Sequence, residues 1–214
     1  MKTAIVIGAT GLVGSELLTL LLASAEYASV LVLSRRSSRL AHAKLTERRI
    51  DFDAPDLRGI TGDDFFCAFG TTLRKAGSKE AQRRIDCDYP TTLASLLKRQ
   101  GVRRMFLVSS LGADANARSF YLNTKGKLEC NIIGLDFDRT VIVRPSVLVG
   151  NRPEFRRGEE MAIRVMSVLS PLLRGRLAKY RPIEASAVAR CLLQQAASHT
   201  SGLSIIESDQ LRTS

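Results

Sequence analysis

The sequence predicts an α/β fold, in which helices flank a mostly parallel sheet, and three observations support this prediction. An apolar run, Thr3 to Ile7, leads directly into a glycine-rich turn and then into a leucine-rich helical pattern. Short apolar strands alternate with helical segments through most of the chain. The length of 214 residues suits one domain with a full sheet core. Together these observations predict a single doubly wound Rossmann-type domain over residues 1–214.

The glycine turn is the densest signal in the chain. It comprises Gly8, Ala9, Thr10, Gly11, Leu12, Val13 and Gly14. Gly8 permits the tight turn after the strand, Gly11 lets backbone N–H groups approach a pyrophosphate, and Gly14 allows the helix to pack closely on the strand. A phosphate is favoured at the helix N-terminus, where unpaired donors and the helix dipole attract negative charge. A tight βα turn without a ligand is the alternative.

The second predicted strand, Val30 to Leu33, is followed by Arg35 and Arg36, about twenty residues beyond the last glycine of the turn. An NAD-selective site has an acidic residue here to bind the ribose 2′-hydroxyl, whereas arginine suits the 2′-phosphate of NADP. Asp and Glu are absent from Ala28 to Thr46. The sequence therefore predicts NADP(H) in preference to NAD(H), with Arg35 as the phosphate clamp and Arg36 as a stacking or second phosphate partner.

The third and fourth predicted strands each end in residues suited to a nucleotide. Arg48 to Phe52 is expected to end at Asp51 and Phe52, where this fold often meets adenine, although a solvated turn before Pro55 is an alternative. Asp64 to Phe69 leads into Gly70, Thr71 and Thr72, whose small and hydroxyl side chains let the backbone approach phosphates and ribose.

A candidate catalytic set follows the fifth predicted strand, Met105 to Val108. That strand ends in Ser109 and Ser110, and the next helix opens with Tyr121 and Lys125. The i, i+4 spacing places phenol and ammonium on the same helix face. A phenol is a poor acid or base at neutral pH, and a nearby ammonium favours its phenolate form. A serine here would stabilise charge on the same substrate oxygen. A Tyr–Lys pair alone is usually a surface pair, so the order of the motifs carries the prediction.

The sixth predicted strand, Thr140 to Val143, ends in Arg144 and Pro145. Residues from about 146 to 182 are predicted to form a substrate-side lid, apolar within and basic outside, with an apolar helix interrupted at Pro171. Ordinary core packing is the alternative for this region, and a membrane-surface segment at Leu172 to Arg181 is a weaker one. A further helix, residues 185–198, and a last strand, residues 203–206, complete the chain.

Composition narrows the function classes. The net charge is +11, with arginine supplying 24 of the 32 basic residues, but they are scattered, which argues against a nucleic-acid-binding arm. The excess either helps to recruit an anionic cofactor or is an arginine bias. Four widely spaced cysteines and two histidines suggest neither a metal site nor disulfides, so a reducing cytoplasm is expected. No run approaches the roughly 20 apolar residues of a membrane span.

In its motifs the chain resembles the atypical branch of the short-chain dehydrogenase/reductase superfamily, and specifically the Tat-interacting oxidoreductase-like group. The resemblance covers residues 5 to about 150. It is carried by the segments Phe66 to Thr72, Lys75 to Gly77, Asp86 to Tyr89, Ser109 to Ala113, Phe120 to Leu122 with Lys125 and Gly126, and Phe137 to Arg139. It implies a seven-stranded parallel Rossmann sheet, NADPH binding and a catalytic set of Ser110, Tyr121 and Lys125, the lysine also contacting the nicotinamide ribose.

Two points in the resemblance stay open. Ser110 is chosen over Ser109 because the superfamily's serine usually occupies the second place of such a pair. The asparagine that completes the superfamily's catalytic tetrad has no clear counterpart in this chain.

The predicted function is that of an NADPH-dependent oxidoreductase acting on a carbonyl or alcohol, and the alternative is an NADPH-binding regulator or sensor that acts through a protein partner. The residues predicted to bind the dinucleotide are Gly8, Thr10, Gly11, Leu12, Val13, Gly14, Arg35, Arg36, Asp51, Phe52, Phe69, Gly70, Thr71, Thr72, Ser109, Tyr121, Lys125, Arg144 and Pro145. We expect a small-molecule substrate, no nucleic acid and no membrane span, and a homodimer is a possible assembly.

Overall fold

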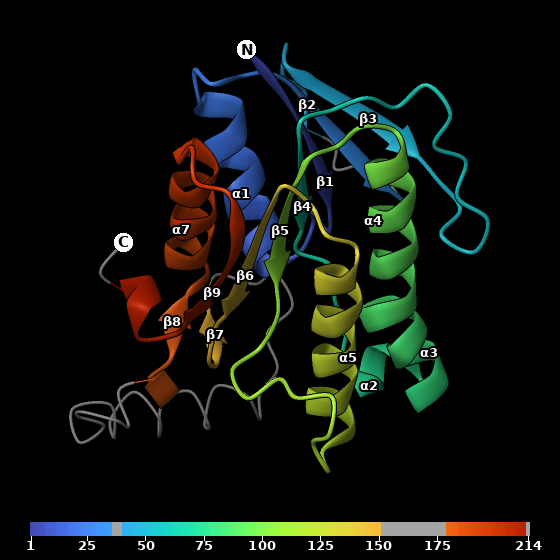
Figure 1. Cartoon of the computed structure of the whole chain (residues 1–214), viewed down its shortest axis with the longest axis vertical. Helices are drawn as coiled ribbons and strands as arrows, with labels where there is room; N and C mark the ends of the chain where they lie inside the picture. The colour runs from blue at the N-terminus through green and yellow to red at the C-terminus, as the bar shows by residue number, and fades with distance from the viewer. Residues whose placement is uncertain (36–39, 151–178, 213–214) are drawn as a thin grey trace.

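The computed structural model describes residues 1–35, 40–150 and 179–212. Seven strands form the central sheet in the order β3-β2-β1-β4-β5-β6-β9, and every neighbouring pair is parallel (Figure 1). The strands are Lys2–Ile7 (β1), Tyr27–Ser34 (β2), Leu45–Arg49 (β3), Asp64–Cys67 (β4), Arg104–Val108 (β5), Arg139–Arg144 (β6) and Gly202–Glu207 (β9). The predicted doubly wound, parallel Rossmann sheet is confirmed.

In the described ranges, four long helices cover the two faces of this sheet. Helices α1 (Leu12–Ala23) and α7 (Ala185–Ala197) lie on one face, and α4 (Tyr89–Arg99) and α5 (Phe120–Gly134) lie on the other (Figure 1). Each covered face buries its own core, as expected when helices pack on both sides of a parallel sheet.

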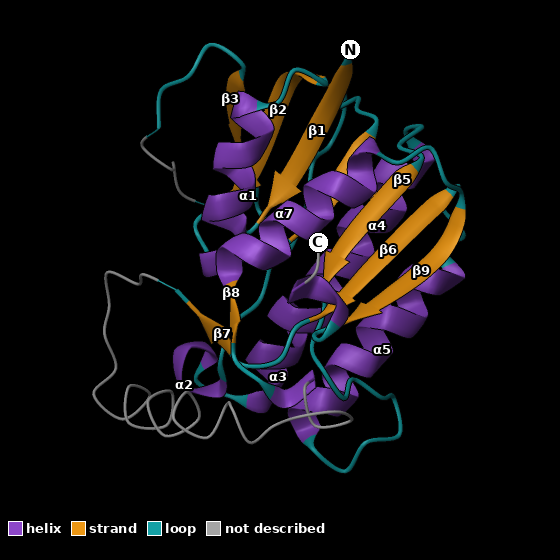
Figure 2. Ribbon diagram, turned by 90° about the vertical axis from the view of Figure 1, so that its left-hand side faces the viewer, coloured by secondary structure: helices purple, strands orange, loops and turns teal. Residues whose placement is uncertain are grey.

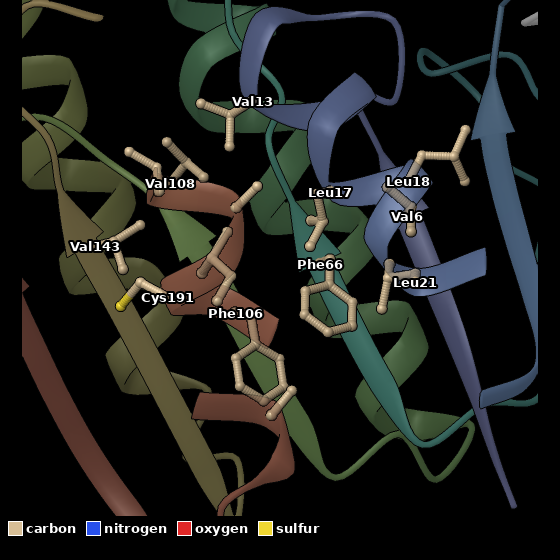
Figure 3. Packing of buried hydrophobic residues seen from close by; sticks show 14 of the residues in the cluster. Val6, Val13, Leu17, Leu18, Leu21, Phe66, Phe106, Val108, Val143 and Cys191 are labelled. Carbon is tan, nitrogen blue, oxygen red and sulfur yellow. The ribbon is translucent and has the colours of Figure 1, made fainter. Parts of the chain in front are cut away.

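The strand sequences supply both cores because successive side chains point to opposite faces. Val6 and Phe66 pack against α1 and α7, where Figure 3 shows them with Leu17 and Cys191. Their chain neighbours Ile5 and Phe65 belong to the core under α4 and α5 instead. Near-continuous apolar strands are therefore required, and the sequence has them.

Local sequence signals account for the ends of the helices, and α7 lies close to the predicted residues 185–198. Helix α4 carries Pro90 in its first turn and is followed by Gly101, whose φ of 96° suits glycine. Helix α5 covers the predicted Tyr121–Lys125 segment completely. Between β4 and α4 the chain forms two short helices, α2 (Leu73–Ala76) and α3 (Lys79–Arg83), and a single π-helical turn, η1 (Arg84–Asp88).

Two features differ from expectation. The third strand lies at Leu45–Arg49 rather than Arg48–Phe52, because its register with β2 pairs Val30 with Leu45. Two short strands, β7 (Leu148–Val149) and β8 (Ile183–Glu184), form a separate parallel pair. Strands of two residues are too short to be predicted from a periodic sequence pattern. Figure 2 shows this pair beyond the carboxyl end of the large sheet.

The predicted lid, residues of about 146–182, lies mostly outside the described residues, as does its helix interrupted at Pro171. The β7–β8 pair is the part of that region that the structure describes. The substrate-covering role of the region stays a prediction. None of the helices in the described ranges is both long enough and apolar enough to cross a membrane.

Candidate functional site

The carboxyl ends of β1 and β4 meet where the strand order reverses, which is the point where open α/β sheets bind ligands. The glycine turn occupies this point. Gly8 has a φ of 80°, and a Cβ atom on it would lie 2.4 Å from the carbonyl oxygen of Ala68. A Cβ atom on Gly14 would lie 2.0 Å from the carbonyl oxygen of Gly8. The turn is therefore packed so tightly against β4 and α1 that no side chain fits at either glycine.

The N-terminus of α1 faces this turn without a side chain of its own to cap it. Gly11 is the N-cap residue, its N–H donates to the Gly8 carbonyl over 2.9 Å, and the first turn of α1 holds no acidic residue. Thr10 is exposed, Leu12 is half-buried, and the Val13 side chain points into the core beside α1. Backbone donors at a helix N-terminus free of negative charge suit a phosphate group.

Arg35 follows β2 and is exposed, whereas Arg36 lies outside the described residues. Asp53 accepts a hydrogen bond from the Tyr89 hydroxyl over 2.7 Å and pairs with the Arg84 guanidinium. The pKa of the Asp53 carboxyl is lowered, chiefly by the Tyr89 hydrogen bond and also by the charges of Arg84 and Arg35. The guanidinium groups of Arg84 and Arg35 therefore lie near the Asp53 carboxylate, next to the residues predicted to contact adenine.

The predicted adenine residues lie in the loop after β3. The Phe52 ring is buried and stacks on Phe69, with ring centroids 4.9 Å apart and an interplanar angle of 5°, and Tyr89 lies 5.7 Å away. Asp51 is exposed, and its carboxylate accepts a hydrogen bond from the Asp53 N–H over 2.9 Å. The aromatic cluster is thus part of the core, and Asp51 shapes the turn above it.

The loop after β4 connects the sheet to η1 and α2. The Thr71 N–H donates to the Asp86 carboxylate over 2.7 Å, and the Thr72 side chain caps α2 by accepting from the Lys75 N–H. A Cβ atom on Gly70 would lie 3.6 Å from the Lys125 Nζ atom. The structure therefore brings the predicted loop of β4 against the predicted catalytic helix.

Helix α5 presents Tyr121 and Lys125 at different depths. Tyr121 is 38% exposed, whereas Lys125, one turn further on, is 4% exposed. The orientation of α5 is fixed by Gly126, since a Cβ atom there would lie 2.1 Å from the Ala115 backbone nitrogen. The Asn123 side chain also donates to the Ala115 carbonyl. The loop before α5 therefore locks the helix with the phenol toward solvent and the ammonium inside.

The two candidate serines differ in burial. Ser109 is 5% exposed, its backbone N–H donates to the Val143 carbonyl over 2.8 Å, and its Oγ atom has no hydrogen-bond partner in the described part of the chain. Ser110 is half-buried, and its carbonyl accepts from the Ala113 N–H. Strand alternation places Ser109 on the same face as Leu107, which packs in the core under α4 and α5. Both serines remain candidates.

Arg144 and Pro145 have internal partners. The Arg144 guanidinium donates three hydrogen bonds, of 3.0, 3.2 and 2.5 Å, to the Glu129 carboxylate, whose side chain is 4% exposed. The hydrogen bonds and charge of Glu129 raise the pKa of Arg144. The Pro145 carbonyl accepts from the Leu111 N–H over 2.9 Å. These contacts hold the end of β6 against α5, and a dinucleotide contact by Arg144 stays a prediction.

Three residues near the site had no role in the sequence prediction. Asp86 is fully buried beside the β4 loop, Gly126 fixes α5, and Glu129 holds Arg144. Asp86 and Gly126 were visible as members of family-like motifs, and Glu129 stands one turn after Lys125 on the same helix face. Spacing alone did not say what they touch.

A cavity of about 280 Å³ opens beside the start of α1 and the β7–β8 pair. Its described lining residues are Leu12, Ser15, Glu16, Val149, Gly150, Glu184, Ala185 and Ser186. Leu12 is the member shared with the predicted dinucleotide residues. Within residues 1–35, 40–150 and 179–212, no group of three His, Cys, Asp or Glu side chains is arranged to hold a metal ion.

The strand order, the glycine turn at the reversal point and the Tyr–Lys pair on the helix after β5 define a Rossmann protein of the short-chain dehydrogenase/reductase type. The comparison with protein families agrees. The chain belongs to the NAD dependent epimerase/dehydratase family, whose model matches residues 4–119.

Curated relatives confirm the predicted atypical branch. The chain is 40% identical over 153 residues to "Protein FMP52, mitochondrial" of Meyerozyma guilliermondii, a match that covers 70% of this chain and 66% of that protein. It is 36% identical over 169 residues to "Protein HTATIP2" of Rattus norvegicus, covering 75% of this chain and 69% of that protein. The chain thus spans about two thirds of the length of these relatives.

The predicted cytoplasmic location is wrong on this comparison. Relatives from Meyerozyma guilliermondii, Candida albicans and Aspergillus niger, at 35–40% identity, are named as mitochondrial proteins. The prediction rested on cysteine usage, which separates oxidising from reducing compartments and does not distinguish one reducing compartment from another.

Solved structures confirm the fold. MoeE5 in complex with UDP-glucose and NAD matches with a TM-score of 0.70 at 18% identity, covering 99% of this chain and 80% of that one. The Bordetella bronchiseptica enzyme WbmH in complex with NAD⁺ also matches with a TM-score of 0.70, at 16% identity, covering 97% and 76%. At these identities the comparison establishes a shared fold.

Proposed function

We propose that this protein is an NADP(H)-dependent oxidoreductase that transfers hydride between the nicotinamide and a carbonyl or alcohol substrate. The observation that carries the proposal is the arrangement on α5, where a buried Lys125 ammonium lies one turn from the partly exposed Tyr121 phenol. Lysine side chains are rarely buried, because removing the ammonium charge from water costs free energy, so a buried lysine usually has a functional or structural role.

The glycine turn fits a dinucleotide phosphate. Close backbone contacts leave no room for a side chain at Gly8 or Gly14. The first turn of α1 has no side-chain cap and no acidic residue. The residues that would hold the cofactor here are the backbones from Gly8 to Val13, with the loop from Phe69 to Thr72 on the opposite side. Lys125 would reach the nicotinamide ribose.

A bound nicotinamide supplies hydride exchange. In the direction of reduction, the Tyr121 hydroxyl gives its proton to the carbonyl oxygen, and in oxidation the phenolate takes the proton of the alcohol. Ser110, or its neighbour Ser109, donates a hydrogen bond to the same oxygen and stabilises the charge that develops on it.

The preference for NADP(H) rests on Arg35. Its guanidinium follows β2 and is exposed, and no carboxylate from Ala28 to Thr46 competes for a ribose 2′-hydroxyl. We expect Arg35→Ala to weaken NADPH binding far more than NADH binding, measured by titration of each dinucleotide. An equal loss for both dinucleotides would contradict a 2′-phosphate clamp.

The test of the reaction uses Tyr121→Phe. NADPH oxidation is followed against a panel of aldehydes and ketones, and NADPH affinity is measured separately. We expect turnover to disappear and affinity to stay nearly unchanged, because the hydroxyl moves a proton and Phe keeps the ring. A variant that retains turnover contradicts the mechanism, and a wild-type protein that binds NADPH and reduces no substrate supports a sensor instead.

A further inference from the structure

The proposed reaction does not explain how the buried positive charge of Lys125 is compensated. Its side chain is 4% exposed, and burial of an ammonium is costly unless an opposite charge compensates it. Two arginines of the sheet have partners in direct contact, since Arg104 pairs with Asp64 and Arg139 donates to the carbonyl groups of Ser201 and Gly202. Lys125 has no such direct ion pair in the described structure.

Asp86 is placed to compensate this charge. It lies in the π-helical turn η1, is fully buried, and accepts from the Thr71 N–H over 2.7 Å and from the Gln82 side chain over 3.2 Å. A Cβ atom on Gly70 would lie 3.3 Å from Asp86 Oδ1 and 3.6 Å from Lys125 Nζ. One atomic position thus touches both charged groups, and it is left open because residue 70 is glycine.

The other titratable groups around Lys125 do not supply the compensation. Burial raises the pKa of the Cys67 thiol to about 11 and raises that of Cys87, so both thiols are neutral at pH 7. Glu129, one turn further along α5, is engaged by Arg144. Tyr121, one turn before, is a phenol. Asp86 is therefore the carboxylate that faces the ammonium, from the element packed against α5.

The electrostatic coupling runs in the expected direction. Burial raises the pKa of the Asp86 carboxyl, and the charge of Lys125 opposes that rise together with the Thr71 and Gln82 hydrogen bonds. The coupling acts across a gap, since the Asp86 oxygens are held by Thr71 and Gln82. A π-helical turn is a feature that recurs at functional sites.

We propose that Asp86 is a positioning residue for Lys125, which compensates the buried ammonium across the space beside Gly70 and leaves its N–H donors free for the nicotinamide ribose and the Tyr121 hydroxyl. A bidentate contact like that of Arg144 with Glu129 would occupy two of the three ammonium donors and leave one for both the ribose and the Tyr121 hydroxyl. The inference rests on the proposed function, because the free donors need a ligand.

A double-mutant cycle on NADPH affinity tests whether Asp86 acts through Lys125. The variants are Asp86→Asn, Lys125→Met and the two combined. Asp86→Asn keeps an amide oxygen for the Thr71 N–H, and Gln82 accommodates the new amide by turning its own. We expect each single change to weaken binding about tenfold, about 1.4 kcal/mol, and the double variant to bind no more weakly than Lys125→Met. Additive losses of about a hundredfold would overturn the proposal.

A second measurement needs neither cofactor nor substrate. The Asp86 side-chain carboxyl is followed by ¹³C NMR as the pH changes, in the wild-type protein and in Lys125→Met. Removing the ammonium removes a contribution that lowers the pKa of Asp86, so we expect the carboxyl to titrate at higher pH in the variant. An unchanged titration means that the two groups are not coupled, and the inference is then wrong.

Asp64→Asn is the matched control, because Asp64 is also a fully buried aspartate paired with a basic residue, at the opposite end of the sheet. We expect it to leave both NADPH affinity and the titration of Asp86 unchanged under conditions where it is folded. Equal effects from the two asparagine variants would reduce the role of Asp86 to general stability and would overturn the proposal.

The two proposals fail in different ways. Binding of NADPH without turnover of any carbonyl would remove the proposed reaction and leave the coupling of Asp86 to Lys125 standing. Turnover with additive losses in the double-mutant cycle would do the opposite.

Discussion

The two ends of the central sheet treat buried polar groups differently. At the amino ends of the strands, Asp64 accepts from the Tyr27 hydroxyl and makes two hydrogen bonds of 2.5 Å to the Arg104 guanidinium. At the carboxyl ends, the Ser109 hydroxyl has no partner in the described structure and Lys125 has no direct ion pair.

The two ends differ in how far their buried polar groups are hydrogen-bonded to one another. Buried polar groups stabilise a fold when they are mutually satisfied, and they cost stability when they are not. Arg139, at the start of β6, donates to Ser204 over 2.8 Å and to Gln195 over 3.0 Å, although its Nε atom lacks a partner. At the amino end most buried polar groups contact one another, whereas at the carboxyl end Arg144 is paired with Glu129 but Ser109 and Lys125 lack such partners in the described residues. Unpaired donors at this end are what the proposed dinucleotide site requires.

The largest expected effect is at the amino end. Asp64→Ala leaves the buried Arg104 without its counter-charge and Tyr27 without its acceptor, so we expect a loss of about 3–5 kcal/mol in the free energy of unfolding. Urea unfolding monitored by circular dichroism measures it. A loss below about 1 kcal/mol would mean that this network contributes little and that the contrast between the two ends is not one of stability.

The second effect is on binding at the carboxyl end. Gly14→Ala introduces a Cβ atom 2.0 Å from the Gly8 carbonyl oxygen, so α1 has to move away from the glycine turn. We expect NADPH affinity to fall about a hundredfold, which corresponds to about 2.7 kcal/mol.

Gly134→Ala provides the control for that substitution, because a Cβ atom there meets nothing within 4 Å and its φ is not positive. This variant is expected to bind NADPH normally. If Gly14→Ala bound NADPH as well as Gly134→Ala, the glycine turn would have a structural role only and would not bind the phosphate.

The contrast between the ends also explains what the sequence could and could not predict. The glycine turn, the alternation of strands with helices and the Tyr121–Lys125 pair depend on residues that are close in sequence, and their patterns are recognisable locally. The contact of Arg104 with Asp64, by contrast, joins residues 40 positions apart, and that of Arg144 with Glu129 joins residues 15 apart. No periodicity specifies which buried charges meet after the strands assemble.

Asp86 belongs to the second group. Its motif was visible in the sequence, but its position beside Lys125 depends on the π-helical turn and on the missing side chain at Gly70. The third strand illustrates the same limit. The sequence predicts it at Arg48 to Phe52, but its pairing with β2 places it at Leu45–Arg49, so Asp51 and Phe52 lie in the loop that follows.

The third prediction compares hydroxyl groups at the two ends with a pair of substitutions. Tyr27→Phe removes a donor to Asp64, and we expect it to destabilise the protein by about 1–2 kcal/mol. Ser109→Ala removes a buried hydroxyl that has no partner, so we expect the free energy of unfolding to stay equal or to rise by about 1 kcal/mol. Thermal unfolding of both variants measures the difference, and losses of equal size would contradict the contrast.

The smallest expected effect is a difference in how stability depends on pH. Burial raises the pKa of Asp86 above the ordinary aspartate value of 3.8, so the folded protein holds this proton at pH values where the unfolded chain has released it. Between those two pKa values the folded state binds more protons, and the contribution of Asp86 to stability therefore falls as the pH rises.

Asp86→Asn removes that contribution. The stability of the variant relative to the wild type should increase from about pH 4 upward and level off above the folded-state pKa. Urea unfolding of both proteins at closely spaced pH values measures the difference, and a constant difference across the series would mean that Asp86 titrates alike in the folded and unfolded states, as a solvated carboxylate would.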